Sequence, residues 1–251
     1  MQTQADSSSG APVVGARRWT LFAVLIVLSV ALEGSEILAA PYLHLTVTAL
    51  LVVGVLSSAA LLAAAGAGVG LWLGPTLGWD ILGLRGWRRG VAIAIVAGLI
   101  MGATQATFAA RFLALFGLNL SSSIPLWLGV IGGIAGAFRE EIIFRMGLMT
   151  LLTWLGVKLF RQTKPGAALV WAANILTAIA FGAMHYSSDS TQVSGAISPI
   201  AFAILITTYH GLAGLLFGWL YWKRGTLAAM VGHFTTDLII TLLTAIPGFV
   251  V

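Results

Sequence analysis

A small set of ionisable side chains lies inside long apolar stretches of a chain in which only 8% of residues are charged. They occur in three short sequences, FREEIIFR (138–145), FGAMH (181–185) and HFTTD (233–237). A charge in the middle of a membrane span costs roughly 2.5–3.5 kcal/mol, so it needs a partner or a wet cavity. Two imidazoles and two carboxylates on three helices would be enough for acid–base or metal chemistry.

The spacing within these sequences separates the side chains by function. Glu141 and Arg145 are four residues apart and can form an ion pair along one helix face. Glu140 points about 100° away from that face, over a surface rich in glycine (Gly133, Gly136 and Gly147). Another helix or a substrate backbone can therefore come close to Glu140. His233 and Asp237 share a face of the last apolar segment in the same way.

A structural interpretation of these residues stands beside the chemical one. Two carboxylates and two guanidinium groups sum to zero, so FREEIIFR could be a neutral cluster that locks a helical bundle. Each histidine alone is more often structural, and we treat His44 and His210 in that way. Arg139 receives no role from the sequence.

The composition predicts an all-α protein, a polytopic transmembrane bundle of about seven or eight spans. The 251 residues are 59% hydrophobic, and the mean hydropathy is +1.00, which no soluble core could accommodate. Residues 1–18 are predicted to be a disordered cytoplasmic tail, and 19–251 one helical domain. The chain has no cysteine, which excludes disulfides and thiol chemistry. The apolar segments are 19–40, 45–73, 91–117, 126–155, 167–186, 197–222 and 226–248.

The charges between these segments predict an orientation. Basic connections alternate with neutral or acidic ones, which places the N-terminus in the cytoplasm and the protein in the plasma membrane as a multi-pass protein. Arg111 alone does not fit. The isoelectric point near 10.1 is then a sign of topology, and no nucleic-acid partner is expected.

Depth in the membrane offers a check on the three sequences. At 1.5 Å per residue and a core of ~30 Å, Glu140 lies ~9 Å and His233 ~10 Å from the cytoplasmic face. His185, counted from residue 167, lies ~27 Å from it. The fifth span must therefore start later, near Asn174, or be tilted or broken, if His185 is to join the other two.

Taken together, EExxxR (140–145), FxxxH (181–185) and HxxxD (233–237) resemble the motifs of the CPBP family. These are the CAAX-protease and bacteriocin-processing intramembrane endopeptidases, also called Abi proteins, and 211–237 is similar to their last conserved block. The resemblance places a catalytic core at about 126–248 and implies cleavage of a membrane-associated peptide or protein, lipidated in the eukaryotic relatives. The chain has Met146 where many members have Gly, and Asp237 where many have Asn.

The resemblance also implies a role for each residue. Glu140 would activate water, His185 would orient it, His233 and Asp237 would bind a metal or stabilise the oxyanion, and Glu141 with Arg145 would support the base. An ionised Asp237 cannot donate a hydrogen bond to an oxyanion. It would therefore bind a metal or orient His233.

The need for a metal, and the function itself, have alternatives. His185, His233, Asp237 and Glu140 could hold zinc with an open position, although a Glu–His pair could activate water without metal. One alternative to an endopeptidase is a non-catalytic bacteriocin-immunity or scaffold protein, and another is a proton-coupled transporter. The lack of an inverted repeat in the sequence counts against the transporter. The expected partners are the bilayer and a peptide, and no oligomeric state is predicted.

Overall fold

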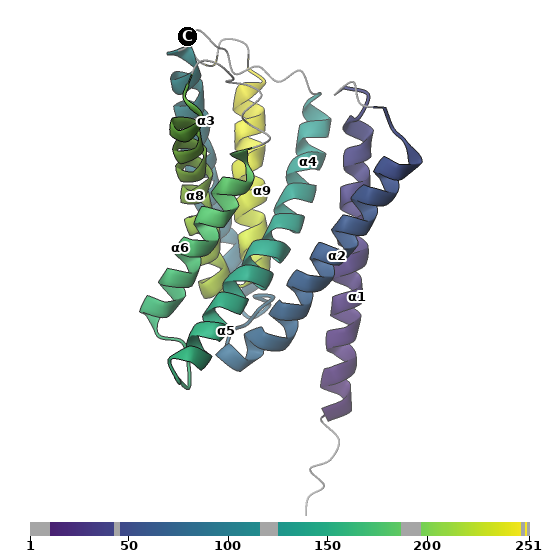
Figure 1. The fold of residues 1–251 in the computed structure, drawn as a ribbon, viewed down its shortest axis with the longest axis vertical. Coiled ribbons are helices and arrows are strands. Elements are labelled where there is room, and N and C mark those ends of the chain that lie inside the picture. Colours follow the sequence, from purple (N-terminus) through teal and green to yellow (C-terminus); the bar gives the residue numbers. More distant parts are fainter. Residues whose placement is uncertain (1–10, 43–45, 116–124, 187–196, 247–248, 250–251) are drawn as a thin grey trace, which may run out of the picture.

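The computed structural model describes residues 11–42, 46–115, 125–186, 197–246 and 249. Every long element in these ranges is a helix, and seven helical segments are long and apolar enough to cross a membrane (Figure 1). The elements are α1 (Ala11–Glu36), η1 (Ile37–Ala39), α2 (Ala49–Leu73), η2 (Gly74–Leu77), α3 (Trp87–Ala114), α4 (Leu126–Glu140), η3 (Glu141–Met149), α5 (Thr150–Leu159), α6 (Ala167–Met184), α8 (Pro199–Arg224) and α9 (Thr226–Thr244). The predicted all-α bundle of about seven spans is confirmed, and the protein is an integral, multi-pass membrane protein.

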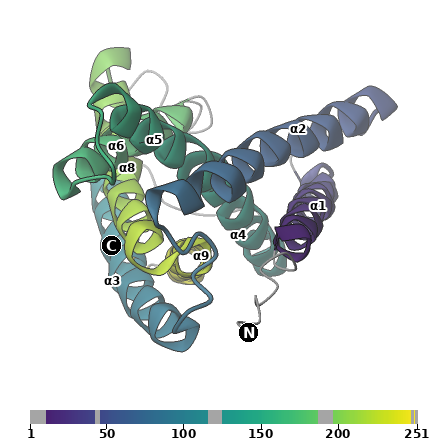
Figure 2. The same ribbon diagram turned by 90° about the horizontal axis from the view of Figure 1, so that it is seen from below.

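The helices form two groups around α4. On one side α9 packs against α3, α4 and α8, and α6 packs against α8. On the other side α1 contacts α2 and α4, and in the view from below α1 lies apart from the α3–α6–α8–α9 group (Figure 2). The fourth span therefore belongs to both groups, and it carries FREEIIFR.

The first helix starts earlier than the sequence analysis predicted. Residues 11–18, assigned there to a disordered tail, belong to α1, which begins at Ala11. Pro12 falls in the first turn, where its fixed φ and missing N–H are tolerated. The apolar run therefore extends the helix ahead of Arg17 and Arg18. Residues 1–10 lie outside the described ranges.

The fourth span changes its winding directly after Glu140. Glu141–Met149 forms a π-helix, and the backbone N–H of Thr150 reaches back to the carbonyl of Arg145. The hydroxyl of Thr150 donates to the same carbonyl at 3.0 Å and pairs with the Tyr221 hydroxyl at 2.7 Å. A π-helix is rare and often marks a functional site. The sequence analysis assumed an α-helix here.

Glycines set how closely α2 lies against this π-helix. A Cβ built on Gly66 would collide with the carbonyl oxygen of Ile142, and one built on Gly147 would come within 3.1 Å of the Cα of Gly66. Gly147, which the sequence placed beneath Glu140, therefore serves helix packing. Gly133 and Gly136 do lie beside the polar cluster.

We expect Gly66→Ala to destabilise the protein by about 1–3 kcal/mol, because the backbone of Ile142 cannot move aside cheaply. Gly54→Ala in the same helix is the matched control, since nothing lies within 4 Å of its added Cβ. The control should be neutral or stabilising by up to about 1 kcal/mol through helix propensity. The free energy of unfolding in detergent micelles, followed by tryptophan fluorescence, measures both. Equal stability of the two variants would show that the close approach is unimportant.

Candidate active site

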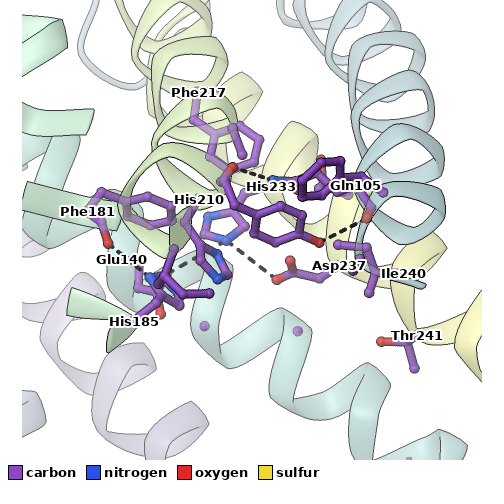
Figure 3. Close-up of a pocket in the computed structure, with 18 of the residues that line it drawn as sticks. Gln105, Glu140, Phe181, His185, His210, Phe217, His233, Asp237, Ile240 and Thr241 are labelled. Carbon is purple, nitrogen blue, oxygen red and sulfur yellow. Dashed lines mark hydrogen bonds and ion pairs between the residues drawn. The ribbon is translucent and has the colours of Figure 1, made fainter. Parts of the chain in front are cut away.

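The three polar sequences meet at one cavity of about 470 Å³. Its walls come from α3, α4, α6, α8 and α9, and Glu140, His185, His210, His233 and Asp237 all line it (Figure 3). The spacing argument predicted that another helix or a substrate backbone can come close to Glu140, and the structure places Gly133 and Gly136 in the same cavity wall as Glu140.

Glu141 and Arg145 form the predicted ion pair in the interior. Both side chains are fully buried, with Arg145 Nε 3.3 Å from Glu141 Oε2. Neither of these two atoms has a hydrogen-bond partner among the described residues. The contact is therefore an ion pair that does not meet the geometry of a hydrogen bond. Arg145 instead donates Nη2–H to the carbonyl of Gly214 at 2.9 Å, and its guanidinium lies 4.6 Å from the Phe181 ring centroid. One arginine thus ties the π-helix to α6 and α8.

His233 lies among three carboxylates. Its Nδ1 is 2.8 Å from Oε1 of Glu141, so an ionised Glu141 accepts the Nδ1 proton. Its Nε2 faces Asp237 Oδ2 at 3.5 Å and Glu140 Oε2 at 3.8 Å. The ring stacks on Phe217 with centroids 4.4 Å apart, which fixes the plane of the imidazole. The buried Glu141 therefore orients His233, and Nε2 points towards the cavity carboxylates.

Arg139, which the sequence left without a role, connects Glu140 to the first helix. Its Nη1 lies 2.6 Å from Glu33 Oε1, and its Nη2 lies 3.1 Å from Glu140 Oε1. The guanidinium holds one oxygen of Glu140, while the other faces His233. Helix α1 thus takes part in positioning Glu140, which no local sequence pattern indicated.

His185 joins the cavity although the depth estimate placed it too far out. Helix α6 begins at Ala167 and is unbroken to Met184, with His185 as its C-cap. The predicted break is therefore wrong, whereas a span that enters the membrane only near Asn174, with 165–173 at the interface, stays a prediction. Figure 1 shows α6 inclined and ending below the upper ends of α3 and α4. His185, the C-cap of this helix, lines the cavity. Its Nδ1–H donates to the carbonyl of Phe181 at 2.9 Å.

The sequence analysis missed His210 as a residue of the site. Its ring stacks on that of His185 with centroids 3.8 Å apart and planes 10° apart, and it lines the same cavity. Next to it, Tyr209 and Gln105 join α8 to α3 through two reciprocal bonds. Gln105 Nε2–H donates to the Tyr209 carbonyl at 2.8 Å, and the Tyr209 hydroxyl donates to the Gln105 carbonyl at 3.1 Å.

A signal for His210 was present in the sequence. An imidazole in the middle of a span is costly without a function or a partner, and that cost alone made His210 a candidate. The other histidine treated as structural, His44, lies outside the described residues.

The predicted metal ligands do not form one coordination shell. Among the described residues, no group of three His, Asp or Glu side chains is placed so that it could hold a metal ion. His233 turns Nδ1 to Glu141, and His185 turns Nδ1 to a backbone carbonyl. The donors of His185, His233, Asp237 and Glu140 therefore do not fit a shared ion in this arrangement.

Comparison with known families agrees with the resemblance that the motifs indicated. Residues 122–239 match the family model described as type II CAAX prenyl endopeptidase Rce1-like. The match covers just under half of the chain, and this region is similar to that family. The similarity supports the fold of a CAAX-type intramembrane protease, as the resemblance predicted. Comparison with curated proteins, and with solved structures, found no match.

The Rce1-like region supplies most of the cavity and all of the predicted site residues. Ile240 and Thr241, just after it, also line the cavity, and the other contributions come from helices that precede it. Glu33 of α1 bonds to Arg139, and Gln105 of α3 lines the cavity and bonds to Tyr209. The Rce1-like region thus depends on α1 and α3 for the completeness of its site.

Proposed function

We propose that the protein is an intramembrane endopeptidase in which Glu140 activates a water molecule with the help of His185 and His233. The observation that carries this proposal is the pairing of Glu140 Oε2 and His233 Nε2 across 3.8 Å at the cavity wall. This separation is too long for a hydrogen bond and suits a water that bridges the two groups. The family match supports hydrolysis of a peptide bond as the reaction.

The proton transfers follow from the donors and acceptors at the cavity. The Glu140 carboxylate takes a proton from the water while the water oxygen attacks the peptide carbonyl carbon. The carbonyl π bond breaks to give an oxyanion, and the proton on Glu140 then passes to the leaving amine nitrogen as the C–N bond breaks. Water is thereby added across the peptide bond, and Glu140 returns to its ionised form.

His233 is suited to meet the developing negative charge. Glu141 accepts the Nδ1 proton, and the carboxylates of Glu140 and Asp237 in front of Nε2 favour a proton there as well. An Nε2–H aimed into a buried cavity is an effective oxyanion donor. Asp237 acts by orienting this group, which agrees with its being Asp in place of Asn.

His185 would hold the water on the other side. Since the Phe181 carbonyl can only accept, Nδ1 of His185 carries the proton, and Nε2 of the neutral ring is an acceptor. The stack with His210 fixes the ring plane in which that acceptor lies.

The test is cleavage of a quenched fluorescent peptide by the purified protein in lipid nanodiscs, with Glu140→Gln as the inactive comparison. Equal cleavage by both proteins would overturn the assignment of Glu140. A scaffold protein on the same fold would cleave nothing and would keep its cellular phenotype in Glu140→Gln. A proton-coupled transporter would show pH-dependent uptake in place of cleavage.

No step of this mechanism passes through a metal, because the predicted ligands do not share one coordination shell. We therefore expect cleavage to persist after prolonged dialysis against EDTA or 1,10-phenanthroline, at a rate within a factor of two of the untreated protein. The rate before and after treatment, together with the metal content by mass spectrometry, measures this. Loss of activity that zinc restores would reinstate the metal site.

A further inference from the structure

The cavity is closed at one end of the bundle and extends towards the other. From His233, the lining continues along α9 to Thr241, ~12 Å away, and along α4 from Glu140 to Gly129, ~16 Å away. The same wall includes the C-terminal half of α3 and the N-terminal part of α8, with Phe108, Phe112, Leu113, Phe202 and Leu205. These parts of the helices all approach the end marked by the C-terminus in Figure 1.

The opposite end of the cavity is filled by side chains. Arg145 and Met146 follow Glu140 along the π-helix towards that end, Leu220 packs against Gly232, and none of the three is exposed. Beneath them, the connection 78–86 docks against the start of α9, where Thr226 donates both its N–H and its hydroxyl to the carbonyl of Ile81 at 2.7 Å each. The described residues therefore close the path from that end to His233.

The closed end is also the basic end. All Lys and Arg residues of the chain lie at that end, apart from Arg139 and Arg145 inside the bundle and Arg111 in the last turn of α3. The connections at the open end, 37–48, 115–125 and 185–198, contain no Lys or Arg. Basic connections stay in the cytoplasm, so the open end faces outwards.

We propose that the cavity receives its peptide from the outer face of the membrane, so that the substrate is a segment of an exported or membrane-inserted protein. The identity of that segment as a substrate rests on the proposed endopeptidase function, whereas the direction of opening does not. A cytoplasmic C-terminal tail, the substrate of the eukaryotic relatives, would have to cross the filled end to reach Glu140.

Cysteine labelling tests the direction of opening, because the chain has no cysteine of its own. Thr241→Cys places a thiol in the cavity near its open end. Gln162→Cys places one in the basic connection after α5, and Thr46→Cys places one in the connection between α1 and α2. Each variant is treated with a membrane-impermeant maleimide in intact and in permeabilised cells. The series is repeated with Glu140→Gln added, so the result does not depend on activity.

We expect Thr241→Cys and Thr46→Cys to be labelled equally in intact and permeabilised cells, and Gln162→Cys only after permeabilisation. Labelling of Gln162→Cys in intact cells would reverse the orientation and overturn the proposal. Labelling of Thr241→Cys only after permeabilisation, or not at all, would show that the cavity does not open outwards and would also overturn it.

Oriented vesicles test the substrate side. With a quenched peptide added outside, we expect cleavage in right-side-out vesicles and at least a tenfold lower rate in sealed inverted vesicles, recovered when detergent opens them. A higher rate in inverted vesicles would overturn the proposal. If no vesicle cleaves the peptide even in detergent, the endopeptidase function fails, and the labelling still decides which way the cavity opens.

Discussion

Replacing Glu140 with Gln is expected to lower kcat for peptide cleavage by about 10²–10⁴-fold, the usual contribution of a general base. Gln keeps the shape of the side chain and can still face Arg139 and His233, but its amide cannot take a proton from water. KM should change little, because the change removes no apolar contact in the cavity. Steady-state cleavage of a fluorescent peptide in nanodiscs measures both constants.

The control for this prediction is Glu33→Gln. Glu33 and Glu140 contact the same guanidinium, at 2.6 and 3.1 Å, but the cavity lining includes only Glu140. If the loss of one negative charge near Arg139 were sufficient to abolish cleavage, Glu33→Gln and Glu140→Gln would lower kcat equally. We expect Glu33→Gln to retain at least a tenth of the wild-type kcat. Equal loss in the two variants would assign the effect to the ion cluster and not to a base.

The largest effect on stability is expected from Arg145→Met. This change leaves Glu141 buried without its cation, and breaking a buried ion pair from one side costs about 3–5 kcal/mol. It also leaves the carbonyl of Gly214 without its donor and removes the guanidinium from the Phe181 ring. The free energy of unfolding in mixed micelles, followed by the fluorescence of the 9 tryptophans, measures the loss.

Arg139→Met is the matched control, because the Arg139 side chain is 28% exposed whereas that of Arg145 is fully buried. We expect it to cost less than about 1 kcal/mol, as for exposed ion pairs. Adding Glu141→Gln to Arg145→Met should recover part of the loss, since the unpaired charge is then removed. An Arg145→Met protein as stable as the Arg139→Met protein would show that the interior pair does not hold the helices together.

The sequence was a good guide to the membrane architecture. Apolar length and loop charge predicted seven spans, and their boundaries agree closely with the helices, apart from the early start of α1 at Ala11. These features depend on one segment at a time, because each segment must by itself bury its backbone hydrogen bonds and match the bilayer thickness. The π-helix escaped prediction since no residue pattern distinguishes it from an α-helix.

Pairs of residues on one helix were also predictable. Glu141 with Arg145 and His233 with Asp237 are four residues apart, and the structure finds both pairs in contact. Helix geometry sets these contacts whatever the rest of the chain does.

Contacts between helices were decided by the tertiary structure alone. Arg139 reaches Glu33, His233 reaches Glu141, and His185 stacks on His210, although none of these partners is near the other in sequence. The inclination of α6 was one of the alternatives that the sequence left open, and the structure shows it together with a cavity that His185 shares. The sequence by itself determined which helices form and which charges share a face, because those depend on local geometry. Tertiary packing determined which faces meet, because crossing angles and glycine contacts are properties of the whole bundle.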